Sequence, residues 1–135
     1  MIKRVRTGKE IIGLAPNRPG VLEGVAKLLA DKGISILAIA GQVTGNISLI
    51  RVVVDDHLHA RDLFRKKRIH AEENPVVLVE TEDRPGALLH ITRKLAERKV
   101  NINAIYGSSA ATYQPCLLVI STDDFQKAMV ALRES

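Results

Sequence analysis

The sequence predicts an α+β fold that is repeated once along a chain of 135 residues, and three observations support this. The hexapeptide NRPGVL at residues 17–22 returns as DRPGAL at residues 83–88. Residues 17–41 then match residues 83–107 without a gap. Each copy also has the same order of strand-like and helix-like apolar patterns. A repeat with that regular order indicates a duplicated structural unit of about 60 residues.

Each copy begins with a short apolar strand, over residues 10–15 and 76–80, and continues into a helix. The helix is indicated by apolar residues that recur three and four positions apart, which places them on one face. The expected stripes are Leu22, Val25, Ala26 and Leu29 in the first copy, and Leu88, Ile91 and Leu95 in the second. We expect these faces to pack against the sheet.

Two further strands and a second helix complete the pattern in each copy. The strands are expected over residues 35–40 and 47–54, with Gly45-Asn46 as a hairpin tip, and over residues 101–106 and 115–120. The second helices have apolar stripes made of Ala60, Leu63 and Phe64, and of Phe125, Ala128, Met129 and Leu132. The order βαββα, with helices on one face of an antiparallel sheet, is typical of a two-layer, ferredoxin-like sandwich.

The full ferredoxin-like order is βαββαβ, so each copy needs a fourth strand. The unassigned strand-like pieces are RIHA at residues 68–71 and KRVR at residues 3–6. In one arrangement each piece forms a hairpin with the strand that follows it. In the other, crossed arrangement, RIHA completes the first copy and KRVR completes the second. We prefer the hairpin, because short connections between neighbouring strands are common. The predicted domains are residues 1–72 and 73–135.

The repeated turn has the local chemistry of a helix start. Asn17 and Asp83 are residue types that cap a helix by accepting a bond from a backbone N–H, and a proline is tolerated close behind them. Gly20 and Gly86 allow strand and helix to approach closely. This chemistry needs no ligand. It also suits one, because the free N–H groups and the dipole of a helix N-terminus favour an anion.

The pattern N/D-R-P-G-x-L, followed by a helix and then by GISI or VNIN where a strand opens, resembles the ACT domain. The resemblance covers nearly the whole chain, once per copy. It implies a non-catalytic regulatory module that binds an amino acid or a similar small metabolite at interfaces between paired domains. A homodimer and a separate metabolic enzyme are the partners that this interpretation implies.

The resemblance places candidate ligand contacts in the two turns and at the opening of each copy's second strand. These candidates are Asn17, Arg18, Gly20, Val21, Leu22 and Ser35 in the first copy, and Asp83, Arg84, Gly86, Ala87, Leu88 and Asn101 in the second. Amino-acid-binding members have an asparagine where the second strand opens, and the first copy has Ser35 there instead. Each copy therefore keeps one amide. Either the two sites differ, or one composite site uses Asn17 and Asn101, or Asn101 is simply a polar residue on the solvated sheet face.

Other functions have less support in the sequence. His57 and His59 form an H-x-H pair, which is only half of a metal site. The net charge of +5 permits nucleic-acid binding, but residues 47–54 and 115–120 lack the aromatic side chains on which ferredoxin-like RNA-binding domains stack bases. No nucleophile with a base, and no carboxylate pair, indicates an enzyme. We expect no cofactor and no resident metal.

The composition indicates a cytoplasmic protein. Hydrophobic residues make up 46% of the chain and charged residues 26%, and no apolar run approaches the roughly 18 to 20 residues of a membrane helix. Cys116 is alone and lies in an apolar run, which fits a reducing compartment and a buried thiol. Small sheets with one open face bury little surface, so we expect at least a homodimer. Within the chain we expect the two copies of the repeat to pack together, with residues 35–40 and 101–106 as the seams.

Overall fold

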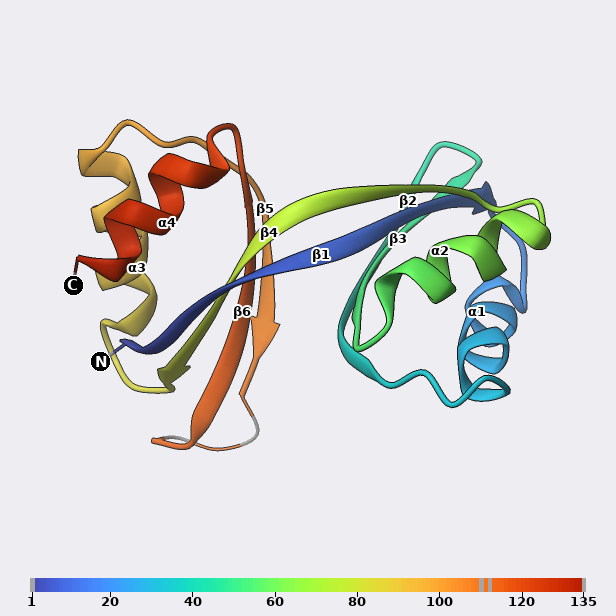
Figure 1. Cartoon of the computed structure of the whole chain (residues 1–135), viewed down its shortest axis with the longest axis horizontal. Coiled ribbons are helices and arrows are strands. Elements are labelled where there is room, and N and C mark those ends of the chain that lie inside the picture. The colour runs from blue at the N-terminus through green and yellow to red at the C-terminus, as the bar shows by residue number, and fades with distance from the viewer. Residues whose placement is uncertain (1, 110, 112, 135) are drawn as a thin grey trace. The chain divides into compact units, whose positions relative to one another are not determined.

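The computed structural model describes residues 2–109, 111 and 113–134. Its helices and strands confirm the α+β class and the repeated order of elements (Figure 1). They are β1 (Ile2–Pro16), α1 (Val21–Ala30), β2 (Ile36–Thr44), β3 (Ile47–Val54), α2 (His57–Lys66), β4 (His70–Glu82), α3 (Ala87–Glu97), β5 (Ile102–Ser108), β6 (Pro115–Thr122) and α4 (Phe125–Arg133). The hairpin tip is confirmed at Gly45, whose φ is 60°.

The strands follow one another in the order β2-β3-β1-β4-β6-β5. Within this order, β3 pairs antiparallel with both β1 and β2, and β6 pairs antiparallel with both β4 and β5. The chain divides into two compact units. The first unit is Lys9–Asn74, and the second unit combines the residues before Lys9 with those from Pro75 on. Each unit has four strands and two helices, which is the ferredoxin-like composition.

The hairpin arrangement of the fourth strands is wrong, and the crossed arrangement is the one observed. β1 is one continuous strand of 15 residues, so it contains no polar turn. Its first part belongs to the second unit, where Lys3 Nζ lies 3.5 Å from Glu82 Oε1. The start of β4 belongs to the first unit. Residues 2–8 thus group with the residues of the second copy.

Gly8 lies inside β1, at the place where the hairpin arrangement would require a turn. A Cβ built on Gly8 would lie 2.6 Å from Cδ1 of Leu78, a separation that real Cβ atoms do not reach. The missing side chain of Gly8 therefore leaves room for the side chain of Leu78 on β4. Such a packing role and a turn look alike in a sequence, because both require the missing side chain.

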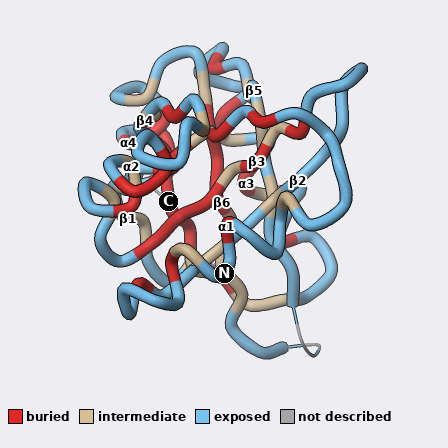
Figure 2. Tube along the Cα trace, turned by 90° about the vertical axis from the view of Figure 1, so that its right-hand side faces the viewer, coloured by how far each residue is buried: buried red, intermediate tan, exposed pale blue. Residues whose placement is uncertain are grey.

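The core of the first unit lies between one sheet face and the helices α1 and α2 (Figures 1 and 2). Phe64 of α2 and Leu29 of α1 are fully buried there against Ile11 and Val52 of the sheet. These side chains alternate along β1 and β3 with residues of the opposite face, as the period of two requires. Of the predicted helix stripes in this unit, Val25, Leu29, Ala60, Leu63 and Phe64 are buried.

The core of the second unit is built in the same way between the sheet and the helices α3 and α4. Ile91 and Leu95 of α3 and Leu132 of α4 are fully buried against Val79 and Ile120. The predicted stripes are confirmed at Ile91, Leu95, Ala128, Met129 and Leu132. Removing a buried side chain such as Leu95 or Phe64 would cost about 2–5 kcal/mol.

Three predicted core positions are not in the core. Leu22 is 52% exposed and Leu88 is 54% exposed, and Ala26 is also exposed. Leu22 and Leu88 stand in the first turn of their helices, where the helix has only just left the sheet. Both lie instead at the rim of a cleft that is described below. The described residues include no helix that is long and apolar enough to cross a membrane.

The strands that were expected as seams between the copies, β2 and β5, are the two end strands of the order, so they do not pair with each other. Their role as a packing seam stays a prediction. Ile39 on β2 and Ile105 on β5 are exposed, at 44% and 39%. Each of these strands therefore has a free hydrogen-bonding edge within the described chain and carries apolar side chains beside it.

Candidate functional site

The two helices that follow the repeated turn begin at glycines. Gly20 precedes α1 with a φ of 90°, and Gly86 precedes α3 with a φ of 89°. The expected close approach of strand and helix is not the reason for either glycine, because a Cβ at these positions would meet no atom within 4 Å. The reason is the positive φ, a backbone conformation that residues other than glycine rarely adopt.

The prediction that Asn17 and Asp83 cap these helices is wrong. The N-cap position lies further along the chain, at Gly20 and Gly86, and no side chain in the described part of the chain accepts a hydrogen bond there. The other two helices differ. Asp56 accepts a bond from the N–H of His59 at the start of α2, and Asp124 does the same at the start of α4.

The repeated turn therefore leaves its helix starts open. The first N–H groups of a helix have no partner within the helix, and they lie at the positive end of its dipole. In α2 and α4 an aspartate satisfies part of this need. In α1 and α3 the first N–H groups, of Val21 and Ala87, donate to the carbonyls of Arg18 and Arg84 at 3.3 and 3.1 Å. The N–H groups that follow them have no side-chain cap, and the glycine leaves the approach to them clear for an anionic ligand.

Asn17 and Asp83 hold the turn to the neighbouring hairpin. The backbone N–H of Asn17 donates to the carbonyl of Asn46 at 2.7 Å, and that of Asp83 donates to the carbonyl of Gln114 at 3.0 Å. The Asn17 side chain is also engaged, since its Oδ1 accepts a bond of 3.2 Å from Ser48 Oγ. This bond fixes the amide and leaves its Nδ2 group to donate elsewhere.

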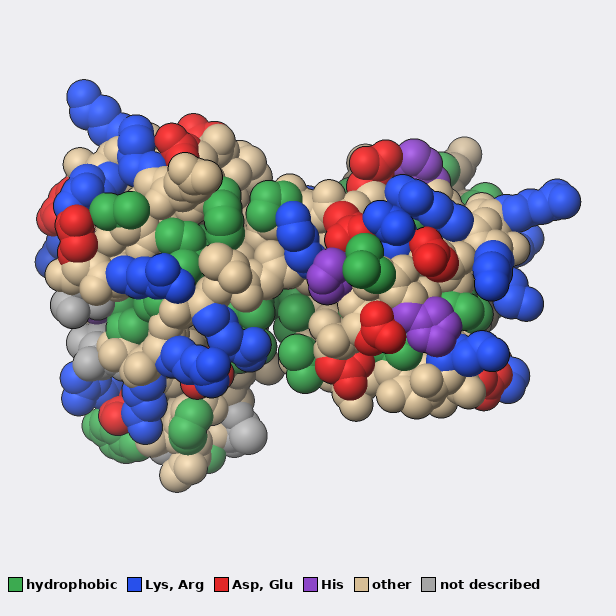
Figure 3. Space-filling view, in the orientation of Figure 1, with side chains coloured by type: hydrophobic (Ala, Val, Ile, Leu, Met, Phe, Trp, Pro, Cys, Tyr) green, Lys and Arg blue, Asp and Glu red, His purple; other side chains and the backbone are tan. Residues whose placement is uncertain are grey.

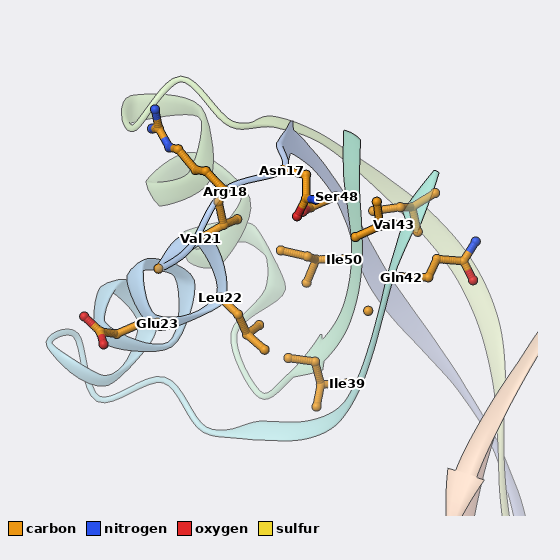
Figure 4. A pocket seen from close by; sticks show the side chains of 13 residues that line it. Asn17, Arg18, Val21, Leu22, Glu23, Ile39, Gln42, Val43, Ser48 and Ile50 are labelled. Atoms are coloured by element: carbon orange, nitrogen blue, oxygen red, sulfur yellow. The ribbon is translucent and has the colours of Figure 1, made fainter. Parts of the chain in front are cut away.

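A cleft of about 530 Å³ lies between the start of α1 and the strands β2 and β3, and we call it the first cleft. Leu22, Ile39 and Ile50 point toward one another across it, while Asn17 and Ser48 form a polar end (Figure 4). All but one of the first copy's candidates line this cleft, namely Asn17, Arg18, Gly20, Val21 and Leu22. The cleft therefore combines an open helix start with an apolar wall.

A second cleft of about 390 Å³ lies at the corresponding place in the other unit, between the start of α3 and the strands β5 and β6. All but one of the second copy's candidates line it, namely Asp83, Arg84, Gly86, Ala87 and Leu88. Glu82, Cys116 and Leu118 add to the lining. The two clefts are thus built from equivalent elements, although the second is smaller and more acidic.

Ser48 and Cys116 are functional candidates that the sequence comparison did not find. Ser48 pairs with Ala15 across the sheet, and Cys116 pairs with Thr81, so the two residues occupy equivalent positions. The gapless match ends at Gly41 and Gly107, ahead of a hairpin loop that is longer in the second copy. Allowing two extra residues in that loop would have aligned Ser48 with Cys116.

The thiol of Cys116 is part of the second cleft and is not deep in the core, contrary to the expectation of a buried side chain. It is partly buried and lines the cleft together with Asp83. Burial raises the pKa of the Cys116 thiol above its ordinary value of 9.0, and the nearby charge of Asp83 raises it further. The thiol is therefore protonated at neutral pH and is a poor nucleophile.

Ser35 and Asn101 lie elsewhere. The N–H of Ser35 donates to Asp55 Oδ1 at 3.1 Å, and the N–H of Asn101 donates to Asp123 Oδ1 at 2.9 Å. Both residues are exposed, and neither lines the cleft of its own copy. Their role in ligand binding, including a composite site of Asn17 with Asn101, stays a prediction.

The histidine pair contacts two different carboxylates. His57 Nδ1 lies 2.8 Å from Glu73 Oε2, and His59 Nδ1 lies 3.6 Å from Asp56 Oδ2. Glu73 also accepts a bond of 2.6 Å from Arg61. Within residues 2–109, 111 and 113–134 there is no group of three or more His, Cys, Asp or Glu side chains that could hold a metal ion.

Comparison with known proteins identifies the repeat. The family model described as "ACT domain" matches twice, at residues 11–66 and 75–134. No curated protein matches the chain significantly by sequence. Similar solved structures exist. Protein BT0572 from Bacteroides thetaiotaomicron has a TM-score of 0.87 and 22% identity, with 96% of this chain and 89% of that chain covered.

Two further structures are regulatory subunits of aspartate kinase by their titles. The subunit from Thermus thermophilus, in a ligand-free form, has a TM-score of 0.68 and 20% identity. The subunit from Thermus flavus has a TM-score of 0.64 and 20% identity. In both cases 98% of this chain and 97% of that chain are covered. At this level of identity the likeness extends to the fold.

Proposed function

The chain belongs to the ACT domain family, and we propose that it is a non-catalytic regulatory module that binds an amino acid or a similar small metabolite in its clefts. Family membership supports a regulatory role through small-molecule binding. The observation that carries the proposal is the repeated cleft beside an uncapped helix start. A helix start that only shaped the chain would gain from a cap, as α2 and α4 do.

The first cleft offers complementary groups for each part of an amino acid. A carboxylate would be stabilised by the N–H groups at the start of α1, where the dipole is positive. Asn17 Nδ2 would donate a further bond, because Oδ1 of the same amide is held by Ser48. An apolar ligand side chain would contact Leu22, Ile39 and Ile50. A pocket of a few hundred Å³ suits a ligand of this size.

The second cleft offers a different balance of charge. Asp83 and Glu82 place two carboxylates in its lining, where they would attract the ammonium group of a ligand. Lys3 lies 3.5 Å from Glu82 and reduces that charge in part. We therefore propose that the two clefts differ in affinity and in ligand preference.

We also propose that the protein pairs as a homodimer and acts on a separate metabolic enzyme in the cytoplasm. The exposed edges of β2 and β5, with Ile39 and Ile105 beside them, support pairing of ACT domains. The similar regulatory subunits of aspartate kinase support an enzyme partner. Light scattering should then give a mass of at least twice 14.8 kDa. The division of the repeat at residues 72 and 73 remains part of this proposal.

A thermal-shift screen of the twenty amino acids tests the proposed function. A ligand that binds only the folded state stabilises it, by about 2.7 kcal/mol at a concentration of 100 times Kd. At least one amino acid should therefore raise the melting temperature at millimolar concentration. A screen in which none does so, confirmed by calorimetry without heat of binding, would leave a structural module as the better interpretation.

A further inference from the structure

A third hollow lies on the helix side of the first unit and is separate from the proposed ligand clefts. It has a volume of about 670 Å³ and lies between α1 and the turn from α2 into β4. Ala15, Pro16, Val25, Leu28 and Ile69 give it apolar walls. It shares Arg18, Gly20 and Val21 with the first cleft, so the turn before α1 forms a common wall. We call it the basic groove.

The basic groove has an excess of positive charge. Arg18, Lys67 and Arg68 line it, and among the described residues none of these side chains makes a hydrogen bond or an ion pair. Lys27 also lines the groove, but its Nζ lies 3.0 Å from Asp31 Oδ2 on the same helix, so that pair is neutral overall. Three unpaired cations therefore remain.

The space-filling view agrees with this placement. Lys and Arg side chains project at the end of the first unit where β1 ends and α2 turns into β4 (Figure 3). In the close-up of the first cleft, Arg18 points away from that cleft (Figure 4). Arg18 lines both hollows, but its guanidinium points out of the first cleft (Figure 4). The basic groove lies on another side of the turn.

Gly24 gives a second, independent reason to regard the groove as a binding site. It lies inside α1, where glycine is less favourable than alanine by roughly 0.5–1 kcal/mol. Its φ is not positive, and a Cβ at this position would meet nothing within 4 Å, so the fold does not require a glycine. The second copy has His90 at the equivalent position of α3.

We propose that the basic groove binds a small organic anion that carries at least two negative charges and an apolar body. The three cations would form ion pairs with the anionic groups of the ligand, and arginine is suited to two-point contact with a phosphate or carboxylate. The apolar walls would contact the apolar body of the ligand. The missing side chain at Gly24 lets the ligand approach the helix backbone closely.

Calorimetry on the intact chain at physiological salt tests this proposal with three probes. ADP represents a phosphate-bearing anion, citrate represents a multivalent carboxylate, and adenosine has no charge. We expect ADP or citrate to bind and adenosine not to bind, and the comparison of ADP with citrate distinguishes the two anion chemistries. Screening by salt weakens binding to exposed charges, so binding at physiological salt is a stringent condition.

Two sets of variants separate the groove from general surface charge. Lys67→Gln with Arg68→Asn removes two groove cations, and Asn suits the positive φ of 61° at residue 68. Lys32→Gln with Lys66→Gln removes two exposed lysines outside the lining and is the matched control. The groove pair should weaken binding about 10-fold or more, and the control pair about 2-fold or less.

A second pair of variants tests the space in the groove. Gly24→Leu should fill it and weaken binding about 10-fold or more, whereas Gly24→Ala, whose Cβ takes only part of the same space, should weaken binding by about 2- to 3-fold. Both replacements should preserve or raise the melting temperature, so this pair decides the question even if the charge variants fold poorly. Absence of binding by both anions at millimolar concentration, equal losses in the two charge pairs, or full binding by Gly24→Leu would each overturn the proposal.

Discussion

Ser48 and Cys116 occupy equivalent positions in the two units, and each faces the residue that opens the repeated turn. Ser48 Oγ donates a hydrogen bond of 3.2 Å to Asn17 Oδ1. At the other cleft the thiol of Cys116 lies near the carboxylate of Asp83, whose charge helps to raise the pKa of the thiol. One cleft therefore has a neutral amide and hydroxyl pair, and the other has an acid and thiol pair.

Replacing the acid and thiol pair of the second cleft by the amide and hydroxyl pair of the first should change the ligand preference of the second cleft. Asp83→Asn with Cys116→Ser gives the second cleft the polar pair of the first, and removes one negative charge from its lining. We expect a zwitterionic or anionic amino acid that binds the first cleft to gain affinity for the second by roughly 5-fold, which is the worth of about one hydrogen bond. Calorimetric stoichiometry and affinity, compared with the parent protein, measure this gain. An unchanged isotherm would mean that the pair does not contact the ligand.

A large side chain at residue 20 should weaken ligand binding, because it would fill part of the first cleft. Any side chain at this residue is strained because φ is 90°, so Gly20→Ala and Gly20→Leu both carry a cost of about 1–2 kcal/mol in folding. The two variants differ in how far they fill the first cleft. We expect Gly20→Leu to bind an amino acid at least about 10-fold more weakly than Gly20→Ala, by calorimetry. Equal affinities would place the ligand away from the start of α1.

The raised pKa of Cys116 has consequences for reactivity and for stability. Alkylation of the native protein by iodoacetamide should be half-maximal above pH 9.0, and Asp83→Asn should move that midpoint down, because a negative neighbour is removed. A midpoint that is unmoved in the variant would show that burial acts alone.

The raised pKa of Cys116 makes the free energy of unfolding depend on pH, and the sign follows from the number of protons bound in the folded and unfolded states. When the folded-state pKa is the higher one, the native protein holds its proton while the unfolded chain has lost it. The contribution to the free energy of unfolding is therefore fully present below the unfolded pKa and is lost as pH rises through the folded pKa. Urea unfolding of the parent and of Cys116→Ser between pH 8 and 10 should show this loss in the parent only.

Removal of residues 1–7 should loosen the second unit and not the first. These residues include the part of β1 that contacts β4 through the ion pair of Lys3 with Glu82. Amide exchange should therefore rise along residues 76–80 and stay slow along residues 10–15, since local opening follows lost backbone pairing. Faster exchange at residues 10–15 alone would contradict the division of β1 between the units.

Long apolar patterns were readable from the sequence. Ile91 and Leu95 were assigned correctly to a buried helix face, and Gly45 to a hairpin tip, because periodicity and turn chemistry are local. Leu22 and Leu88 satisfied the same periodicity but are exposed at the rims of the clefts. The pattern predicts a face of the helix, and it does not say where along the helix the contact with the sheet begins.

Features that depend on distant residues were not readable. Gly8 is compatible with the turn of a hairpin, but it lies within β1 and leaves room for the side chain of Leu78, which is 70 residues later in the sequence. Asn17 has the chemistry of a helix cap, but the positive φ of Gly20 places the helix start beyond its reach. The equivalence of Ser48 and Cys116 was hidden from a gapless comparison, because the hairpin loops that precede them differ in length, and the sheet register reveals it.

The most direct test of the account is a titration of the ¹⁵N-labelled chain with the amino acid that gives the largest thermal shift, followed by amide chemical shifts. The account predicts that the perturbed amides cluster at residues 20–23 and 86–89, at the uncapped starts of α1 and α3, because a carboxylate bound there changes the hydrogen bonds of those N–H groups. Saturable shifts confined to these residues and their cleft neighbours would support ligand binding in the repeated turns. Saturable shifts confined to other parts of the chain, or no shifts at millimolar ligand, would contradict it.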